Sequence, residues 1–328
     1  MKFSLLAVAI FLSMFVSAQD CSKEALRKKP GRWTPGLQGS IRNVNAADLA
    51  KEKATMAKVH KMVTASYKPV GCEISHNTVF GKHLPAASNW IADPYYYSMY
   101  VLRYLCDESS ADKSKHYVDH STPTVVNISA NQIQWLDVLY AADMASDDFR
   151  GYLKLKTRPV RKDSVWFMGE EVAVNSDQQN KIKEYRWLIT YSDTLPFSYV
   201  TRKEYLLIQK KRLEKGIKES PSQKSYLDKF MQNVNEYLKK PESELNQPAV
   251  CRWNDEERFE GFVEEGTAGS FTAVKPNLAY YRKKLSASSP QFITVVYKIS
   301  HGDPVFEENM AAIQKAVDFK YLRSLLGK

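Results

Sequence analysis

The stretch 185–219, YRWLITYSDTLPFSYVTRKEYLLIQKKRLEKGIKE, places the tightest constraint on the fold of this chain. Residues 186–191 are rich in aromatic and β-branched side chains and predict a strand, and 197–200 predicts a second short strand after a turn. A helix then begins at Thr201. The Thr201 side chain can accept from the backbone of Glu204 while Glu204 reaches back, which predicts a capping box that fixes the start of this helix.

The rest of the chain mixes helical and strand patterns in an irregular order, with no internal repeat. This mixture predicts an α+β fold with mainly antiparallel sheet packed against several amphipathic helices. We expect helices over 46–66, from Ser222 to Pro241 and from Asp303 onward, strands over 95–106, 124–129, 270–274 and 292–299, a β-hairpin across 151–174, and a short helix or a loop edge over 135–145.

The first residues, MKFSLLAVAIFLSMFVSA, combine one lysine, an apolar run and small residues in the order of a secretory signal peptide. We expect cleavage after Ala18 and a secreted or periplasmic protein; a lipid anchor on Cys21 is the alternative. No later segment is apolar enough to predict a membrane helix. The predicted organisation is a signal peptide over 1–18, an extended basic arm over 19–44, and α+β regions over 45–150 and 151–328, either as two domains or as one.

The charge balance is basic, because 47 lysines and arginines face 37 acidic residues for a net charge of +10. Outside the cytosol such a balance favours anionic partners, for example phosphorylated lipid head groups or acidic polysaccharide. Nucleic acid is not expected, since the chain is exported and carries no nucleic-acid motif. The alternative interpretation is that the lysines keep helix faces solvated.

The four cysteines are compatible with disulfides in an exported protein, and their spacing matches no zinc motif. Sequence cannot choose among the pairings. We expect Cys72 to pair with Cys106, because the two flank one segment whose ends can meet.

Two runs carry a family resemblance: LPFSYVTRKEYL at 195–206, and VKPNLAYYRKKL with PQFITVVY at 274–297. They resemble segments of uncharacterised secreted proteins of Bacteroidetes-type bacteria. The resemblance implies a bacterial exported protein, and it implies no activity, cofactor or catalytic residue.

No motif of catalysis or metal binding is complete. HYVDH offers His116, Asp119 and His120, but turn residues surround it and no further ligand can be named, so neither a metal nor a cofactor is predicted. Ser270 in GTAGSF lacks the second glycine of a nucleophile elbow. The adjacent carboxylates Glu170 and Glu171, and Glu264 and Glu265, face opposite ways if they lie on strands. Whether the protein is an enzyme stays open.

Binding residues are easier to nominate. Trp166, Tyr185 and Trp187 fall on neighbouring predicted strands, Arg202 opens the adjoining helix, and Lys210 and Lys211 lie along it. Over 202–219 seven basic residues face three acidic ones. These features predict an exported, non-catalytic protein that binds an anionic or carbohydrate-like component of the cell envelope. The alternatives are that the aromatics fill the core, and that the chain is a secreted hydrolase with an unidentified site.

Overall fold

The computed structural model describes residues 21–39, 41, 44–81, 92–112, 114–121, 124–132, 152–174, 181–252 and 259–328. The fold is α+β with mostly antiparallel sheet, as the sequence predicts. The expected signal peptide over 1–18 and the expected helix or loop edge over 135–145 lie outside the described residues. Among those described, none of the helices is both long and apolar enough to cross a membrane.

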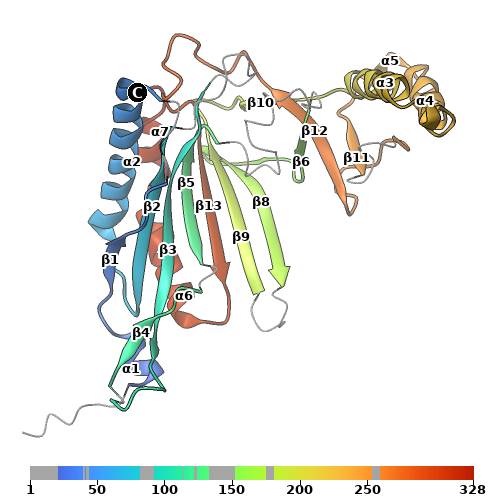
Figure 1. Cartoon of the computed structure of the whole chain (residues 1–328). Helices are drawn as coiled ribbons and strands as arrows, with labels where there is room; N and C mark the ends of the chain where they lie inside the picture. The colour runs from blue at the N-terminus through green and yellow to red at the C-terminus, as the bar shows by residue number, and fades with distance from the viewer. Residues whose placement is uncertain are drawn as a thin grey trace, which may run out of the picture.

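A large sheet organises one half of the molecule (Figure 1). Within the described residues its strand order is β1-β2-β3-β5-β13-β9-β8-β7, with β4 beside β3. All neighbours pair antiparallel except β1 and β2. The strands are β1 Arg32–Pro35, β2 Cys72–Val79, β3 Tyr95–Cys106, β4 His116–Val118, β5 Val125–Ala130, β7 Val160–Lys162, β8 Val165–Val174, β9 Lys181–Ile189 and β13 Ile293–Ser300.

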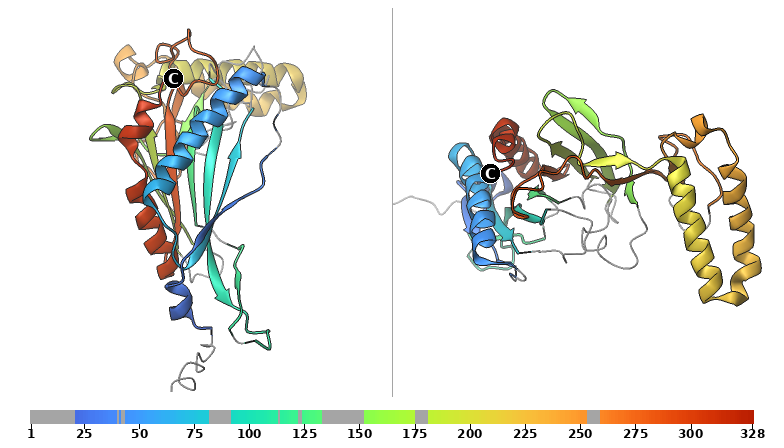
Figure 2. Two further views of the ribbon diagram at one scale, coloured as in Figure 1. Left: turned by 90° about the vertical axis from the view of Figure 1, so that its left-hand side faces the viewer. Right: turned by 90° about the horizontal axis from the view of Figure 1, so that it is seen from above.

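Helices cover one face of this sheet, as Figure 2 shows from the side. They are α2 Ala46–Ser66, α6 Pro304–Ala316 and α7 Phe319–Ser324, while the short α1 Lys23–Arg27 lies near one end of β3. Met56, Val59 and Val63 of α2 meet alternate residues of the strands, such as Ile74 and Val295, in one buried core. The apolar stripe predicted for 46–66 is therefore what holds α2 on the sheet.

A smaller second sheet joins the large one to a pair of long helices (Figure 1). Its strands are β6 Leu153–Leu155, β10 Phe197–Tyr199, β11 Val250–Arg252 and β12 Ser270–Pro276, and its helices are α3 Arg202–Glu219, η4 Pro221–Gln223, α4 Lys224–Leu238 and α5 Glu242–Leu245. Val274 of β12 packs with Leu188 of the large sheet, whereas Phe271 and Ala273 pack under α3 and α4. The alternating faces of β12 thus contribute to two separate cores.

Two local predictions differ from the structure. The residues of the expected arm form α1 and β1, and β1 pairs with β2 as an edge strand of the large sheet. The expected hairpin over 151–174 is divided between sheets, because β6 pairs with β12 while only β7 pairs with β8. The large sheet takes strands from both sides of residue 150, so the two expected regions share one core.

The disulfide expected between Cys72 and Cys106 was wrong: Cys106 pairs with Cys21, and Cys72 is a buried free thiol. Cys72 lies opposite Arg103 on β3, three residues before Cys106. Residues three apart on a strand point to opposite faces, so Cys72 faces the core and Cys106 faces away from it. Burial raises the pKa of the Cys72 thiol to about 12, which keeps it unreactive. A sulfur in a disulfide cannot also carry the alternative lipid anchor on Cys21.

The disulfide gives a first prediction. Peptide mapping of the protein digested without reductant should recover Cys21 linked to Cys106, with Cys72 and Cys251 alkylated only after unfolding. Replacing Cys21 with Ser should lower the free energy of unfolding by about 2–4 kcal/mol, since the bridge closes a long loop. A peptide that links Cys72 to Cys106 would contradict this pairing.

The start of α3 gives a second prediction. The capping box is present as expected, with the Glu204 amide donating to Thr201 Oγ1 at 3.2 Å and the Thr201 amide donating to Glu204 Oε2 at 3.0 Å. Thr201→Ala should cost about 1 kcal/mol, measured as a lower denaturant midpoint with an unchanged slope. Thr267→Ala, on an exposed turn, is the control; an equal loss in both variants would remove the special role of the cap.

Candidate functional site

The pair of long helices carries more than half of the net positive charge of the chain. We call residues 202–240, which comprise α3, η4 and α4, the basic hairpin. It holds eleven basic and five acidic residues, a net charge of +6 out of +10 for the whole chain. Figure 2 shows both helices side by side at the end of the molecule that lies opposite α2.

Apolar side chains fix the hairpin to the second sheet. Tyr205 and Leu206 of α3 and Val234 of α4 are buried against Phe271 of β12. The same core includes Leu213 and Phe230 farther along the two helices. Because these residues occupy the inner stripe of each helix, the lysines between them are directed outward.

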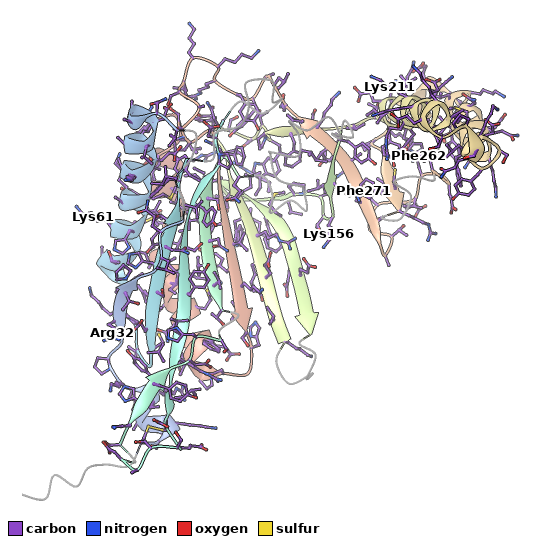
Figure 3. All side chains as sticks on the ribbon, viewed as in Figure 1. Arg32, Lys61, Lys156, Lys211, Phe262 and Phe271 are labelled. Carbon is purple, nitrogen blue, oxygen red and sulfur yellow. A yellow bond between two sulfur atoms is a disulfide. The ribbon has the colours of Figure 1, made fainter. Side chains whose placement is uncertain are left out.

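The outward face of α3 carries cations without carboxylate partners. Lys211 and Lys218 are exposed seven residues apart, and Lys210 lies half-buried beside them. Figure 3 shows Lys211 on the outer side of the hairpin. Within the described part of the chain, Lys210, Lys211 and Lys218 make no ion pair, whereas Lys203 pairs with Glu242 at 2.6 Å. An approaching anion would displace no carboxylate from these three lysines.

Arg202, expected to bind ligand, instead lies at the base of the hairpin. Its guanidinium is 3.5 Å from Glu244 of α5 and stacks on Phe262 with its carbon 5.0 Å from the ring centre. Only 19% of its side chain is exposed. Arg202 therefore joins α3 to α5 and to the segment before β12, away from the outward lysines.

The structure does not gather the three expected aromatics on one surface. Trp187 lies directly opposite Phe167 and shares its face with Tyr185, and both pack into the core under the helices. Trp166 lies opposite Leu188 on the other face and packs into the core between the sheets. All three are half-buried, and the second sheet separates Tyr185 and Trp187 from the basic hairpin (Figure 1).

The motif HYVDH forms no metal centre among the described residues. His116 begins β4 and lies 2.9 Å from the Lys29 ammonium, Asp119 accepts from Arg103, and His120 is exposed. On an extended chain these side chains are spread out, whereas on a helix the two histidines, four residues apart, would share one face.

A cluster that the sequence did not predict lies between α2 and the first three strands. His60 of α2 and His76 of β2 stack with ring centres 4.5 Å apart, and His60 Nδ1 lies 2.8 Å from the Tyr97 hydroxyl. Trp33 of β1 packs edge-on against both histidines. No sequence pattern brings the four residues together, since Trp33, His76 and Tyr97 come from three separate strands and His60 from a helix.

Burial lowers the pKa of His60, and repulsion from a charged His76 lowers it further. Burial also lowers the pKa of His76. Tyr67 and Tyr97 are the other titratable groups around the stacked rings, and burial raises their pKa values, so neither supplies a negative charge. The two imidazoles are therefore neutral in the folded protein near neutral pH.

The histidine pair gives a third prediction. The unfolded chain binds protons at a higher pH than the folded pair, so stability should be full above about pH 6.5 and fall as the pH drops below that value. The urea midpoint should be lower at pH 5.5 than at pH 7.5, and His76→Phe, which keeps an aromatic ring, should reduce this difference. Equal pH dependence in wild type and His76→Phe would exclude the pair as its source.

Searches of family models, curated proteins and solved structures found no match to this chain. The resemblance of 195–206 and 274–297 to secreted bacterial proteins thus stays an expectation. A function for the protein has to come from the geometry of its surfaces, and the basic hairpin is the surface with the clearest chemical character.

Proposed function

We propose that this protein is exported and binds an anionic component of the cell envelope through the outward face of the basic hairpin. The observation that carries the proposal is the row of exposed, unpaired lysines on α3, represented by Lys211 and Lys218. Export itself rests on the N-terminal sequence, whose residues 1–20 lie outside those described.

The distribution of charge supports this proposal over a purely solubilising role. A solvated helix face needs charge of either sign, and mixed signs serve it well. On α3 the cations outnumber the anions by seven to three. The long helix α2, at the opposite end of the molecule, holds four lysines and two acidic residues, one of which, Glu52, is buried. The hairpin thus carries more net positive charge than α2.

The placement of the aromatics favours an anionic ligand at this site over a sugar held by stacking. Trp187 and Tyr185 pack beneath helices, and Trp166 packs between the sheets. The exposed apolar residues of the hairpin, Leu207 at 50% and Tyr226 at 45%, lie on different helices. Attraction to the lysine row is therefore mainly electrostatic, with a range of about 8 Å at physiological ionic strength.

The fourth prediction tests this surface. The variant Lys210→Glu/Lys211→Glu/Lys218→Glu should bind vesicles that contain phosphatidylglycerol at least about 100-fold more weakly than wild type, since each lysine near an anionic surface contributes about 1 kcal/mol. Co-sedimentation at low and high salt measures the affinity. Wild-type binding should weaken sharply with salt, and the same series with isolated peptidoglycan and acidic polysaccharide identifies the anionic component.

A matched control comes from α2. Lys53, Lys58 and Lys61 are exposed, and Figure 3 shows Lys61 at the end of the molecule opposite the hairpin. Reversal of these three charges changes the net charge by the same amount, so it should leave most of the binding intact. Equal losses in both variants would mean that net charge alone drives binding, and no binding of any component by wild type would refute the proposal.

A further inference from the structure

A cavity of about 800 Å³ opens between the connection from β6 to β7, strand β8 and the segment before β12. This volume is within the range of small-molecule sites. Figure 3 shows Lys156, one of its lining residues, beside β6 and away from the hairpin lysine Lys211. None of the lysines of the basic hairpin lines the cavity.

Two ion pairs across different segments form its charged lining. Lys156 pairs with Glu171 of β8 at 3.2 Å, and Arg158 pairs with Glu265 at 3.1 Å. Each of these four side chains remains between 40% and 47% exposed. The pairs therefore hold the groups in position while part of each polar surface still faces the cavity.

The lining also includes hydroxyl groups and close backbone contacts. Thr157 and Ser270 contribute side-chain hydroxyls. Thr157 packs on Gly169, which has φ +115°, and a Cβ there would lie 3.1 Å from the Thr157 side chain. Arg158 is held from a second side, because its guanidinium carbon lies 5.0 Å above the Tyr199 ring.

From this arrangement we infer a second binding site, which takes an uncharged polyhydroxylated ligand, a saccharide unit, between the Lys156–Glu171 and Arg158–Glu265 pairs. Ammonium and guanidinium groups only donate hydrogen bonds, and ionised carboxylates only accept them. A sugar hydroxyl does both, so neighbouring hydroxyls can accept from the cation of a pair while they donate to its anion.

The charge balance of the lining disfavours anions and metal cations as ligands. The four named charges sum to zero, so an anion that approaches the two cations also meets two carboxylates, and a metal cation meets two positive groups. A neutral ligand has no such cost. The site is independent of the basic hairpin, and either one can fail its test without affecting the other.

The electrostatics of Glu171 favour binding over cleavage. Burial raises the pKa of Glu171, but hydrogen bonds and charge from Arg186 and Lys156 outweigh it, and the net effect is a lowered pKa. A carboxyl group that donates a proton to a glycosidic oxygen needs a raised pKa. Glu171 is suited to accept hydrogen bonds from hydroxyl groups.

The fifth prediction is tested by calorimetric titration of the full mature protein with maltotriose, cellotriose and triacetylchitotriose, and with trigalacturonate as the anionic comparison. At least one neutral trisaccharide should bind with a Kd of about 1 mM or below. Its affinity should change less than about twofold between low and high salt, because no net charge is neutralised. Binding of none of the three overturns the inference. Tighter binding of trigalacturonate by the variant Lys210→Glu/Lys211→Glu/Lys218→Glu, in which the hairpin lysines are reversed, also overturns it.

Variants locate the site. Arg158→Met/Glu265→Leu keeps the net charge and should weaken the neutral sugar at least about tenfold, since hydrogen bonds to charged groups are lost. Glu265→Gln keeps the size of the side chain and should weaken binding in the same direction, which covers the case in which the double variant does not fold. The control Lys224→Met/Asp228→Leu removes an exposed ion pair of α4 and should change nothing. Wild-type affinity in folded Arg158→Met/Glu265→Leu overturns the assignment.

Discussion

The two-sided burial of β12 is the constraint on which the arrangement of the molecule depends. Phe271 and Ala273 on one face complete the core under α3 and α4, while Val274 on the other face completes the core against the large sheet. A strand that is buried on both faces cannot shift by one residue without exchanging its two sets of side chains. The register of β12 therefore fixes where the basic hairpin stands relative to the rest of the protein, and Ser270, at its first residue, also lines the cavity.

Local signals were sufficient for much of the secondary structure. The capping box at Thr201, the apolar stripe of α2 and the tyrosine-rich β3 depend on neighbours within a few residues, and α2 and β3 have the predicted bounds. Pairing between distant segments was harder to predict. Leu153 and Leu155 alternate as a hairpin strand would, yet they pair with β12 more than a hundred residues later. The predicted disulfide was wrong for a related reason, since only the register of β2 on β3 shows that Cys72 and Cys106 face opposite sides of the sheet.

The residues of the candidate sites also fall into those that a local sequence pattern indicates and those that depend on contacts between distant segments. The charge of α3 is a property of one helix, so the sequence nominated Lys210 and Lys211 on the helix that carries the exposed lysine row. Whether the predicted aromatic residues share a surface depends on which face of the sheet each one occupies. The strand register places Trp166 and Trp187 on opposite faces. Glu171 and Glu265 were noticed only as members of adjacent carboxylate pairs. Their meeting at one cavity depends on the approach of β8 to the segment before β12, which no local pattern records.

The claim that the hairpin is the anion-binding surface is tested most directly by lysine footprinting. The protein is acetylated with and without vesicles that contain phosphatidylglycerol, and the modified lysines are quantified by mass spectrometry. Our account predicts that Lys210, Lys211 and Lys218 lose reactivity when the vesicles are present, while Lys53, Lys58 and Lys61 on α2 keep theirs. Protection centred on α2, or spread evenly over both helices, would contradict it.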